Sequence, residues 1–468
     1  MGKTISQQWA EYAAALSFSD LPSAAVTEAK RFLLDSIGCA LGGFHVADCR
    51  IARDVIVEMG GTAEATLIAF GDRTNAVNAA LLNSLMIRSM DYNDVYWKQD
   101  PSHPSDLIPA ALSLGERQRS SGQEVITAII IAYDLEMRLC EAAFPGIREI
   151  GWHHASLTQL ASPVVAGKIL RLQPEQYVHA IGISGSHNLT LGAVTAGHLT
   201  MMKNTVDPMA TQSGVFAALL AQRGYVGPEA IFEGKEGLFA QLGVKWDPAR
   251  LVAGLGSEFK IVDCSMKPYP SEALTHSPIT ATLQLVHEHD LHPEEIELVE
   301  VQTIARAADI LSDPSKYEIT SKETADHSLP YCLAAAIADR ELTPRQFQPD
   351  KLSDPRILSL VPKIRVRTND EFERLFPSTQ SCEVAIWARA GRFYRCRVDY
   401  PKGDPRSPLT DRELKRKFTS LADGVLSEQR QQKVVTMIEH LESLADIGEL
   451  MNALVADEAS ARTLRSHT

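Results

Sequence analysis

The sequence predicts a mainly α-helical protein with a smaller second domain of the α+β class. The chain has 468 residues, which is more than one compact core usually holds, so two domains are expected. Apolar residues recur at helical spacing through about the first 260 residues. Beyond that point, three stretches alternate between apolar and polar residues, as strands do. We therefore expect a helical bundle domain of residues 1–265, completed by residues 405–468, and an α+β domain of residues 266–404.

Helices account for most of the first domain. In the stretch from Pro22 to Gly43, Val26, Ala29 and Leu33 belong to one helical face, and two glycines end the pattern. Further helices are expected at 73–90, 105–118, 123–144, 156–171, 175–187 and 208–223. Several of them are apolar almost all round, which is typical of helices buried inside a bundle.

Strands are expected only in the second domain. Residues 296–304, 363–368 and 381–401 alternate with period two, and Ala390-Gly391 lies where a hairpin should turn. A proline-rich linker, residues 401–410, follows. Thr410 and Glu413 then form a capping box that starts the C-terminal helices.

Composition excludes several classes of function. Apolar residues make up 45% of the chain and charged residues 22%, as in ordinary folded proteins. The net charge is 46 − 59 = −13, which argues against nucleic-acid binding but leaves room for one local positive pocket. The seven cysteines are scattered without a CxxC pair, so neither a disulfide framework nor an iron–sulfur cluster is expected. No signal peptide or membrane span is expected, and the predicted location is the cytoplasm.

The chemistry-bearing residues gather at the starts of predicted helices. Five times a His or Lys precedes an apolar helix, in stretches that contain His103, His153 with His154, Lys203, Lys267, and His327 with Tyr331. The N-terminus of a helix favours anions because its N–H groups point outward. If these ends converge, they form a cavity that suits a di- or tricarboxylate.

Such a cavity also suits acid–base chemistry. A histidine titrates near neutral pH and can exchange a proton with a substrate carbon or hydroxyl. Asp91 or Asp94 can orient an imidazole, and the lysines can stabilise negative charge that develops beside a carboxylate. Metal binding is not expected: in HEHDLH (287–292), His287 and His289 are two residues apart and do not share a helical face. No phosphate-binding or dinucleotide-binding glycine motif is present either.

Six stretches, taken in order, resemble the MmgE/PrpD family, and the first five of them contain the helix-start residues just named. They are MDYNDVYW…HPSD, GWHHAS, MMKNTVDPMATQSGVFAALLAQRGYVGP, KPYPSEALTHSPI, HSLPYCLAAAI and VDYPKGDPRSPLT. The family includes 2-methylcitrate dehydratase, cis-aconitate decarboxylase and iminodisuccinate epimerase. The resemblance implies a cofactor-free homodimeric enzyme with a large helical domain and a smaller α+β lid domain.

The resemblance also implies which residues act. It places active-site roles on Asp91, His103, His153, Lys203, Lys267 and Tyr331. We expect His103, oriented by Asp91, to move a proton, with His153 as a second acid–base group and Tyr331 as a hydrogen-bond donor. Lys203 and Lys267, with Asp94 and His154 beside them, are expected to bind the substrate.

The exact reaction stays open at this point. The Asp91-Tyr92-Asn93-Asp94 stretch resembles the dehydratase branch, which favours a lyase that dehydrates a 2-methylcitrate-type acid. GWHHAS resembles the decarboxylase side, so cis-aconitate-type decarboxylation is the alternative. The resemblance also leaves open an epimerisation of the iminodisuccinate type, and the residues alone leave open a non-catalytic, anion-binding dimer. No metal, nucleic-acid or membrane partner is expected.

Overall fold

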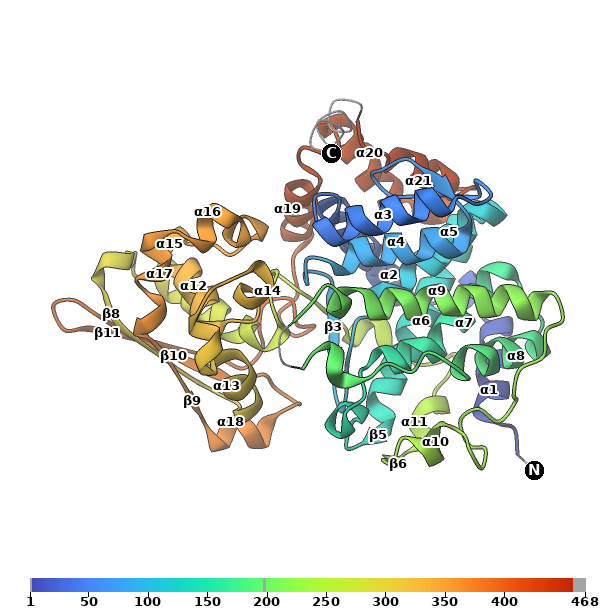
Figure 1. Cartoon of the computed structure of the whole chain (residues 1–468), viewed down its shortest axis with the longest axis horizontal. Helices are drawn as coiled ribbons and strands as arrows, with labels where there is room; N and C mark the ends of the chain where they lie inside the picture. The colour runs from blue at the N-terminus through green and yellow to red at the C-terminus, as the bar shows by residue number, and fades with distance from the viewer. Residues whose placement is uncertain (1, 197–198, 458–468) are drawn as a thin grey trace. The chain divides into compact units, whose positions relative to one another are not determined.

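A computed structural model describes residues 2–196 and 199–457. It divides into two compact units (Figure 1). Unit 1 contains residues 1–89, 93–264 and 410–468, and unit 2 contains residues 90–92 and 265–409. The short segment Met90–Tyr92 belongs to unit 2, which the sequence did not lead us to expect. The DYND stretch is therefore shared: Asp91 lies in unit 2 and Asp94 lies in unit 1.

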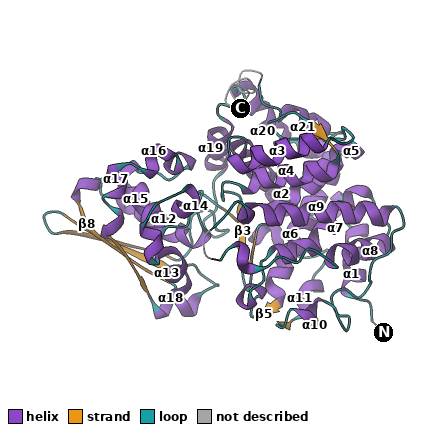
Figure 2. Ribbon diagram, viewed as in Figure 1, coloured by secondary structure: helices purple, strands orange, loops and turns teal. Residues whose placement is uncertain are grey.

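Unit 1 is a bundle of helices with a few two- to four-residue strands (Figure 2). Its helices are α1 (Ile5–Ala15), α2 (Ser23–Gly43), α3 (Ala47–Met59), α4 (Ala76–Arg88), α5 (Ile108–Gln118), α6 (Gly122–Ala142), α7 (Ala155–Leu170), α8 (Pro174–Gly185), α9 (Met202–Gln222), α10 (Leu238–Gln241), α11 (Pro248–Val252), α19 (Asp411–Ala422), α20 (Glu428–Glu439) and α21 (Gly448–Ala453). Its short strands are β1 (Ala65–Thr66), β2 (Arg73–Thr74), β3 (Asp94–Trp97), β4 (Pro101–Ser102), β5 (Ala143–Phe144) and β6 (Lys245–Trp246).

Helices α6, α7 and α9 form the centre of the bundle. Helix α7 packs along both α6 and α9, and α4 packs on α9. Gly214 of α9 lies so close to α7 that an added Cβ would be 2.0 Å from Ser162 Oγ and 2.7 Å from Pro163 N. Only glycine allows this approach, which brings the N-terminal half of α9 alongside the start of α7.

The start of α9 differs from the sequence expectation. Residues 208–223 were expected to form the helix, with Pro208 opening it, but α9 begins at Met202 and Pro208 lies inside it. Lys203 therefore sits in the first helical turn and not in a preceding loop. Residues 203 and 207 are then one turn apart and on the same face of α9. A similar shift occurs at 105–118, where Pro104–Leu107 form a 3₁₀ turn before α5.

Unit 2 contains the longer strands (Figure 2). Strands β8 (Ile296–Thr303), β9 (Ile364–Thr368), β10 (Cys382–Ala388) and β11 (Arg392–Val398) form one sheet in the order β11-β10-β8-β9. The hairpin β10–β11 turns between the paired residues Ala388 and Arg392, and Ala390 and Gly391 in this turn have positive φ values of +61° and +69°. Strand β9 pairs with β8 in parallel, and β10 pairs with β8 antiparallel.

Helices accompany this sheet in unit 2. They are α12 (His276–Glu288), α13 (Ala305–Ser312), α14 (Lys322–Ala325), α15 (Leu329–Asp339), α16 (Pro349–Leu352), α17 (Pro355–Leu358) and α18 (Asp370–Leu375), and a further short strand is β7 (Ser265–Met266). Helix α12 packs against β10 and β11, and α15 packs on α12. The fold is thus mainly α with an α+β second domain, as the sequence predicts.

Within residues 2–196 and 199–457, no single helix is both long enough and apolar enough to span a membrane. One pair, α2 and α3, passes the same test together by length and composition but is bent by 84°.

Candidate active site

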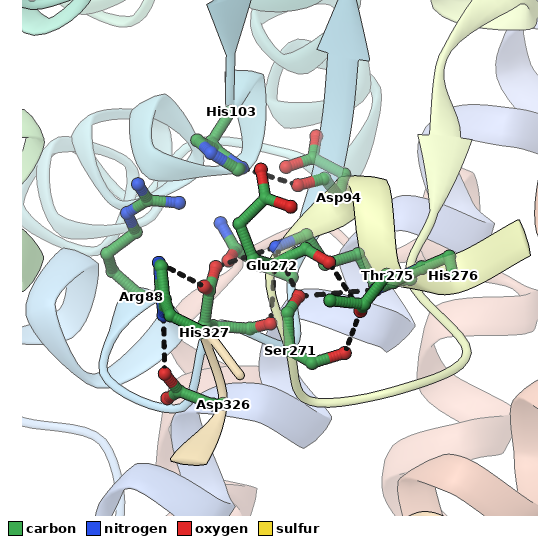
Figure 3. Close-up of polar contacts among 12 residues, drawn as sticks. Arg88, Asp94, His103, Ser271, Glu272, Thr275, His276, Asp326 and His327 are labelled. Carbon is green, nitrogen blue, oxygen red and sulfur yellow. Dashed lines mark hydrogen bonds and ion pairs between the residues drawn. The ribbon is translucent and has the colours of Figure 1, made fainter. Parts of the chain in front are cut away.

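The short hairpin β3–β4 positions His103 in unit 1. Tyr96 pairs with Ser102 across the hairpin, and His103 follows directly. The ring Nδ1 of His103 lies 2.6 Å from the main-chain carbonyl oxygen of Asp94 (Figure 3). Because a carbonyl only accepts hydrogen bonds, Nδ1 carries the proton, and Nε2 is the nitrogen that exchanges protons.

Within unit 1, the Asp94 main-chain carbonyl orients the ring of His103. The predicted orientation of His103 by the Asp91 carboxylate, which belongs to unit 2, stays a prediction. The side chain of Asp94, which we predicted to bind substrate, is held by Ser105. Its two oxygens accept hydrogen bonds from Ser105 Oγ at 2.6 Å and from Ser105 N at 3.0 Å. Burial raises the pKa of Asp94 to about 6, although the Ser105 hydrogen bonds oppose the rise.

Three imidazoles lie together in unit 1, and we call His103, His153 and His154 the histidine cluster. The rings of His153 and His154 are 3.9 Å apart between centroids, and those of His103 and His154 are 5.5 Å apart. All three side chains are buried. Burial lowers the pKa of His153 well below its usual value, and burial likewise lowers that of His154. Both rings are therefore neutral at pH 7.

The main chain fixes His153 at the start of α7. Its N–H donates to the Thr190 carbonyl at 2.8 Å, and its Nδ1 accepts from the Ala155 N–H at 3.2 Å. An acceptor Nδ1 in a neutral ring places the proton on Nε2. The sequence pattern GWHHAS thus marks a helix start that aims two imidazoles into the protein interior.

Buried charges surround the histidine cluster, and the sequence patterns did not reveal them. Asp207 Oδ2 lies 3.4 Å from His154 Nε2 and 3.9 Å from Arg88 Nη2. Arg88 also approaches Asp106, with 3.7 Å between Nε and Oδ2. Arg88 is the charged residue at the end of the largely apolar helix α4, whereas α9 carries Lys203 and several polar residues besides Asp207. The signal in the sequence for Arg88 was a charge at the end of an apolar helix.

The carboxyl groups of this region divide into two protonation states. Burial alone would raise the pKa of Asp207, but His154, His153 and Arg88 outweigh it and hold that pKa far below its usual value. Burial raises the pKa of Glu136 to about 8, against hydrogen bonds from Ser102 and Thr158. Glu136 is then mostly protonated at neutral pH, whereas Asp207 is ionised.

Lys203 is the predicted cation in unit 1. Its side chain is buried in the first turn of α9. It lies on the same helical face as Asp207, one turn before it. The described part of unit 1 thus places two buried cations, Lys203 and Arg88, on α9 and at the end of α4.

Unit 2 holds a second polar cluster, built on an ion pair. Lys267 Nζ lies 2.6 Å from Asp91 Oδ1. It also donates to the carbonyls of Asp91 and Ser271, at 3.3 and 3.1 Å. These three acceptors match the three N–H donors of an ammonium group. Lys267 therefore holds Asp91, whose φ is +52°, and its binding of substrate stays a prediction.

His327, which the sequence placed at a predicted helix start without a specific role, completes this second cluster. Its Nδ1 lies 2.5 Å from Asp326 Oδ1 (Figure 3), and its Nε2 is 4.0 Å from Asp91 Oδ2. Asp326 is also paired with Lys322 at 2.9 Å. Burial raises the pKa of Glu272, while His327 and Lys267 oppose the rise. The signal in the sequence was the adjacent Asp and His directly before a helix start.

Tyr331 packs as a core residue of unit 2, where we predicted a catalytic role. Its side chain is fully buried, and its hydroxyl donates to the Gln346 carbonyl at 2.5 Å. Its ring packs against Phe347, with 5.9 Å between centroids. The hydroxyl is thus satisfied by the packing of unit 2.

One set of residues has the chemistry of a metal site. In residues 2–196 and 199–457, His153, His154 and Asp207 each offer one ligand atom, and these atoms lie within 4.8 Å of one another. The histidines of HEHDLH do not gather in this way. His289 stacks on Tyr394 with 4.1 Å between centroids, and His292 lies at the surface beside Asp290.

Comparison with known proteins agrees with the resemblance found in the sequence. The MmgE/PrpD N-terminal domain matches residues 7–250 and the MmgE/PrpD C-terminal domain matches residues 269–443. A cis-aconitate decarboxylase-like protein of Aspergillus oryzae is 26% identical over 94% of this chain and 95% of its own length. A cis-aconitate decarboxylase of Aspergillus terreus is 25% identical, with 96% of each chain covered. A 2-methylcitrate dehydratase of Escherichia coli is 24% identical over 80% of this chain and 81% of its own length. The chain therefore belongs to the MmgE/PrpD family.

Proposed function

We propose that this protein is a lyase that acts on a small di- or tricarboxylate by acid–base chemistry at the histidine cluster. The observation that carries the proposal is the grouping of His103, His153 and His154, with ring centroids 3.9 and 5.5 Å apart. The names of the relatives support it, because decarboxylases and dehydratases are both lyases. In this proposal the chemistry needs neither a metal nor an organic cofactor.

His103 is the proposed proton-transfer group. Its Nδ1 is held by the Asp94 carbonyl, so its Nε2 exchanges the proton with the substrate. His153 is buried and neutral at pH 7, which suits a second hydrogen-bonding or acid–base group. Lys203 is proposed to hold a substrate carboxylate, because it is the cation one turn from Asp207 on α9.

Decarboxylation of the cis-aconitate type is the reaction we place first. The relatives with that name align over nearly the whole chain, whereas the dehydratase aligns over 80% of it. In this reaction the bond from carbon to a carboxylate breaks, CO₂ leaves, and the electron pair stays on carbon. Lys203 stabilises that charge, and His103, after taking up a proton at Nε2, delivers it to the carbon.

Dehydration of the 2-methylcitrate type is the second candidate. It is favoured by the Asp91-Tyr92-Asn93-Asp94 stretch, which resembles the dehydratase branch. There His103 would take a proton from carbon at Nε2, and the hydroxyl of the neighbouring carbon would leave as water after receiving the Nε2 proton of His153.

Proton NMR of the purified protein with several acids tests the proposal. cis-Aconitate, 2-methylcitrate, citrate and iminodisuccinate would be incubated in parallel, because loss of CO₂, loss of water and inversion give different products. We expect turnover of cis-aconitate or a close analogue. Turnover of 2-methylcitrate instead would favour the second candidate, and inversion of iminodisuccinate would point to an epimerase. No change with any acid would contradict the lyase and favour a non-catalytic anion-binding protein.

A homodimer is part of the proposal, and α9 offers a surface for it. Met202, Met209 and Phe216 are spaced by seven residues and expose 42%, 45% and 51% of their surface. They form one apolar stripe along the helix. A groove of about 650 Å³ runs beside Met209 and Phe216. Light scattering should give twice the chain mass, and the variant Met209→Asp/Phe216→Asp should give the mass of one chain. A wild-type protein that scatters as a single chain would contradict this.

A further inference from the structure

We infer that His153, His154 and Asp207 form a binding site for a divalent transition-metal ion of the zinc type. The three residues come from the start of α7 and the N-terminal half of α9. One ligand atom from each lies within 4.8 Å of the other two. This inference rests on the geometry of unit 1 and not on the proposed reaction.

The ligand atoms lack hydrogen bonds within the described part of the chain. This holds for both ring nitrogens of His154, for Nε2 of His153 and for Oδ2 of Asp207. The 3.4 Å contact between His154 Nε2 and Asp207 Oδ2 brings the two atoms together without hydrogen-bond geometry. Buried polar atoms that remain unsatisfied call for a partner such as water or an ion. Two imidazole nitrogens and one carboxylate oxygen are a ligand set that zinc prefers.

Hydrogen bonds around the site decide which atoms can bind an ion. His153 Nδ1 accepts from the Ala155 N–H, so Nε2 carries the proton of the neutral ring. For Nε2 to bind a metal, that proton must move to Nδ1 and the hydrogen bond to Ala155 is lost, which lowers the affinity. Thr158 Oγ1 lies 3.3 Å from Asp207 Oδ1, but its one proton goes to the nearer Glu136 Oε1, at 2.7 Å. Asp207 Oδ2 is the oxygen that faces His154, and we assign it as the ligand atom. Bonds of about 2.0 Å in a tetrahedral zinc site place two ligand atoms about 3.3 Å apart. The 3.4 Å between His154 Nε2 and Asp207 Oδ2 is close to this spacing. Any separation near the 4.8 Å limit must close by about 1.5 Å on binding.

Arg88 competes with a metal ion for the same carboxylate. Its Nη2 lies 3.9 Å from Asp207 Oδ2, on the oxygen that we assign to the metal. The buried guanidinium repels a divalent cation at short range. We therefore expect moderate affinity in the wild-type protein and tighter binding when the charge of Arg88 is removed.

Metal binding would oppose the proposed chemistry. An ion on His153 would occupy the ring that we propose as the second acid–base group. Zinc should thus inhibit turnover, and a chelator should restore it. Binding itself can be measured whether or not the protein has any enzymatic activity.

Titration of the full-length protein with Co²⁺ and Zn²⁺ tests the inference. After treatment with a chelator, visible absorption would follow Co²⁺, and calorimetry would follow Zn²⁺ with long equilibration because the site is buried. We expect one ion per chain, intense bands of four-coordinate Co²⁺, and an affinity at least tenfold weaker in His154→Asn and Asp207→Asn. The matched control His289→Asn/His292→Asn removes two histidines outside the site and should bind like the wild type. Arg88→Gln should bind at least tenfold more tightly.

Three results would overturn the inference. They are no binding by the wild-type protein, an unchanged affinity in Asp207→Asn, and loss of binding only in the control. Should His154→Asn fail to fold, Asp207→Asn keeps the side-chain shape and decides. A rise in the melting temperature of the wild type with Zn²⁺, absent in Asp207→Asn, is a second readout.

Discussion

Lys267 Nζ lies 2.6 Å from Asp91 Oδ1, and both side chains are almost completely buried, with 2% and 5% exposed. The ammonium also binds the Asp91 and Ser271 carbonyls. A buried charge that loses its partner is costly, at about 3–5 kcal/mol. This pair therefore fixes Met90–Tyr92 within unit 2, in addition to any part that it has in binding substrate.

We expect Lys267→Met to lower the free energy of unfolding by about 3 kcal/mol, because it leaves Asp91 buried without its ion pair. Asp91→Asn/Lys267→Met should recover part of this loss, since asparagine tolerates the positive φ of +52° and carries no charge. Urea denaturation of the two single variants and the double variant measures the coupling. Additive effects of the two substitutions would show that the pair contributes nothing.

His103→Gln should lower kcat by two to four orders of magnitude if His103 transfers the proton, an order-of-magnitude expectation for a lost acid–base group. Glutamine retains an N–H that can reach the Asp94 carbonyl, so folding should be preserved. The exposed His292 provides a control, and His292→Gln should leave kcat unchanged. An equal, small effect of both substitutions would remove His103 from the mechanism.

Sequence patterns predicted the fold class because periodicity survives in a single sequence. The positions of His103, His153 and His154 at element starts were also readable, since Pro104 and the residues of GWHHAS mark those starts. The sequence did not show which of these side chains and main-chain groups contact one another. Asp91 and Asp94 are three residues apart, yet they belong to different units, so the orienting role could not be assigned from their spacing.

The partners of several buried polar side chains depend on tertiary contacts and cannot be read from sequence patterns. Tyr331 faces Gln346, fifteen residues away, and only the packing of unit 2 shows that its hydroxyl is satisfied. Asp207 and Arg88 meet across two helices. A charged residue in an apolar helix indicates that a partner exists, but it does not say which residue that partner is.

Tyr331→Phe distinguishes the catalytic role predicted from the sequence from the packing role that the structure describes in unit 2. The structure predicts a kcat within about twofold of the wild type and a loss of roughly 1 kcal/mol in the free energy of unfolding, from the hydrogen bond to the Gln346 carbonyl. Steady-state kinetics and urea denaturation measure the two quantities. A large fall in kcat with unchanged stability would restore Tyr331 to the active site.

Glu136 should make the protein less stable as the pH rises. Its pKa is raised to about 8 by burial, so between about pH 4.5 and 8 the folded state holds a proton that the unfolded state has released. Folding stability then falls as the pH rises through this range. Glu136→Gln keeps an acceptor for the hydroxyls of Ser102 and Thr158 but cannot ionise.

We expect Glu136→Gln to flatten the pH dependence of stability and to gain at least about 1 kcal/mol at pH 8 relative to the wild type. His153 and His154 act in the opposite sense, because their lowered pKa values reduce stability as the pH falls below about 6.5. Urea denaturation between pH 5 and 8.5 separates the two effects. Parallel curves for wild type and variant would mean that Glu136 is already ionised in the folded state.

Gly214→Ala tests the close contact that places α9 against α7. The new Cβ would lie 2.0 Å from Ser162 Oγ and 2.7 Å from Pro163 N, so the two helices must separate. Overpacking of this kind costs about 1–3 kcal/mol. Because Asp207 is on α9 and His154 is at the start of α7, the separation should also weaken metal binding in Co²⁺ titrations. Thr205→Ala, a more exposed substitution on α9, is the control and should change neither quantity. A variant that is as stable as the wild type would show that α7 and α9 have more room at Gly214 than the structure gives them.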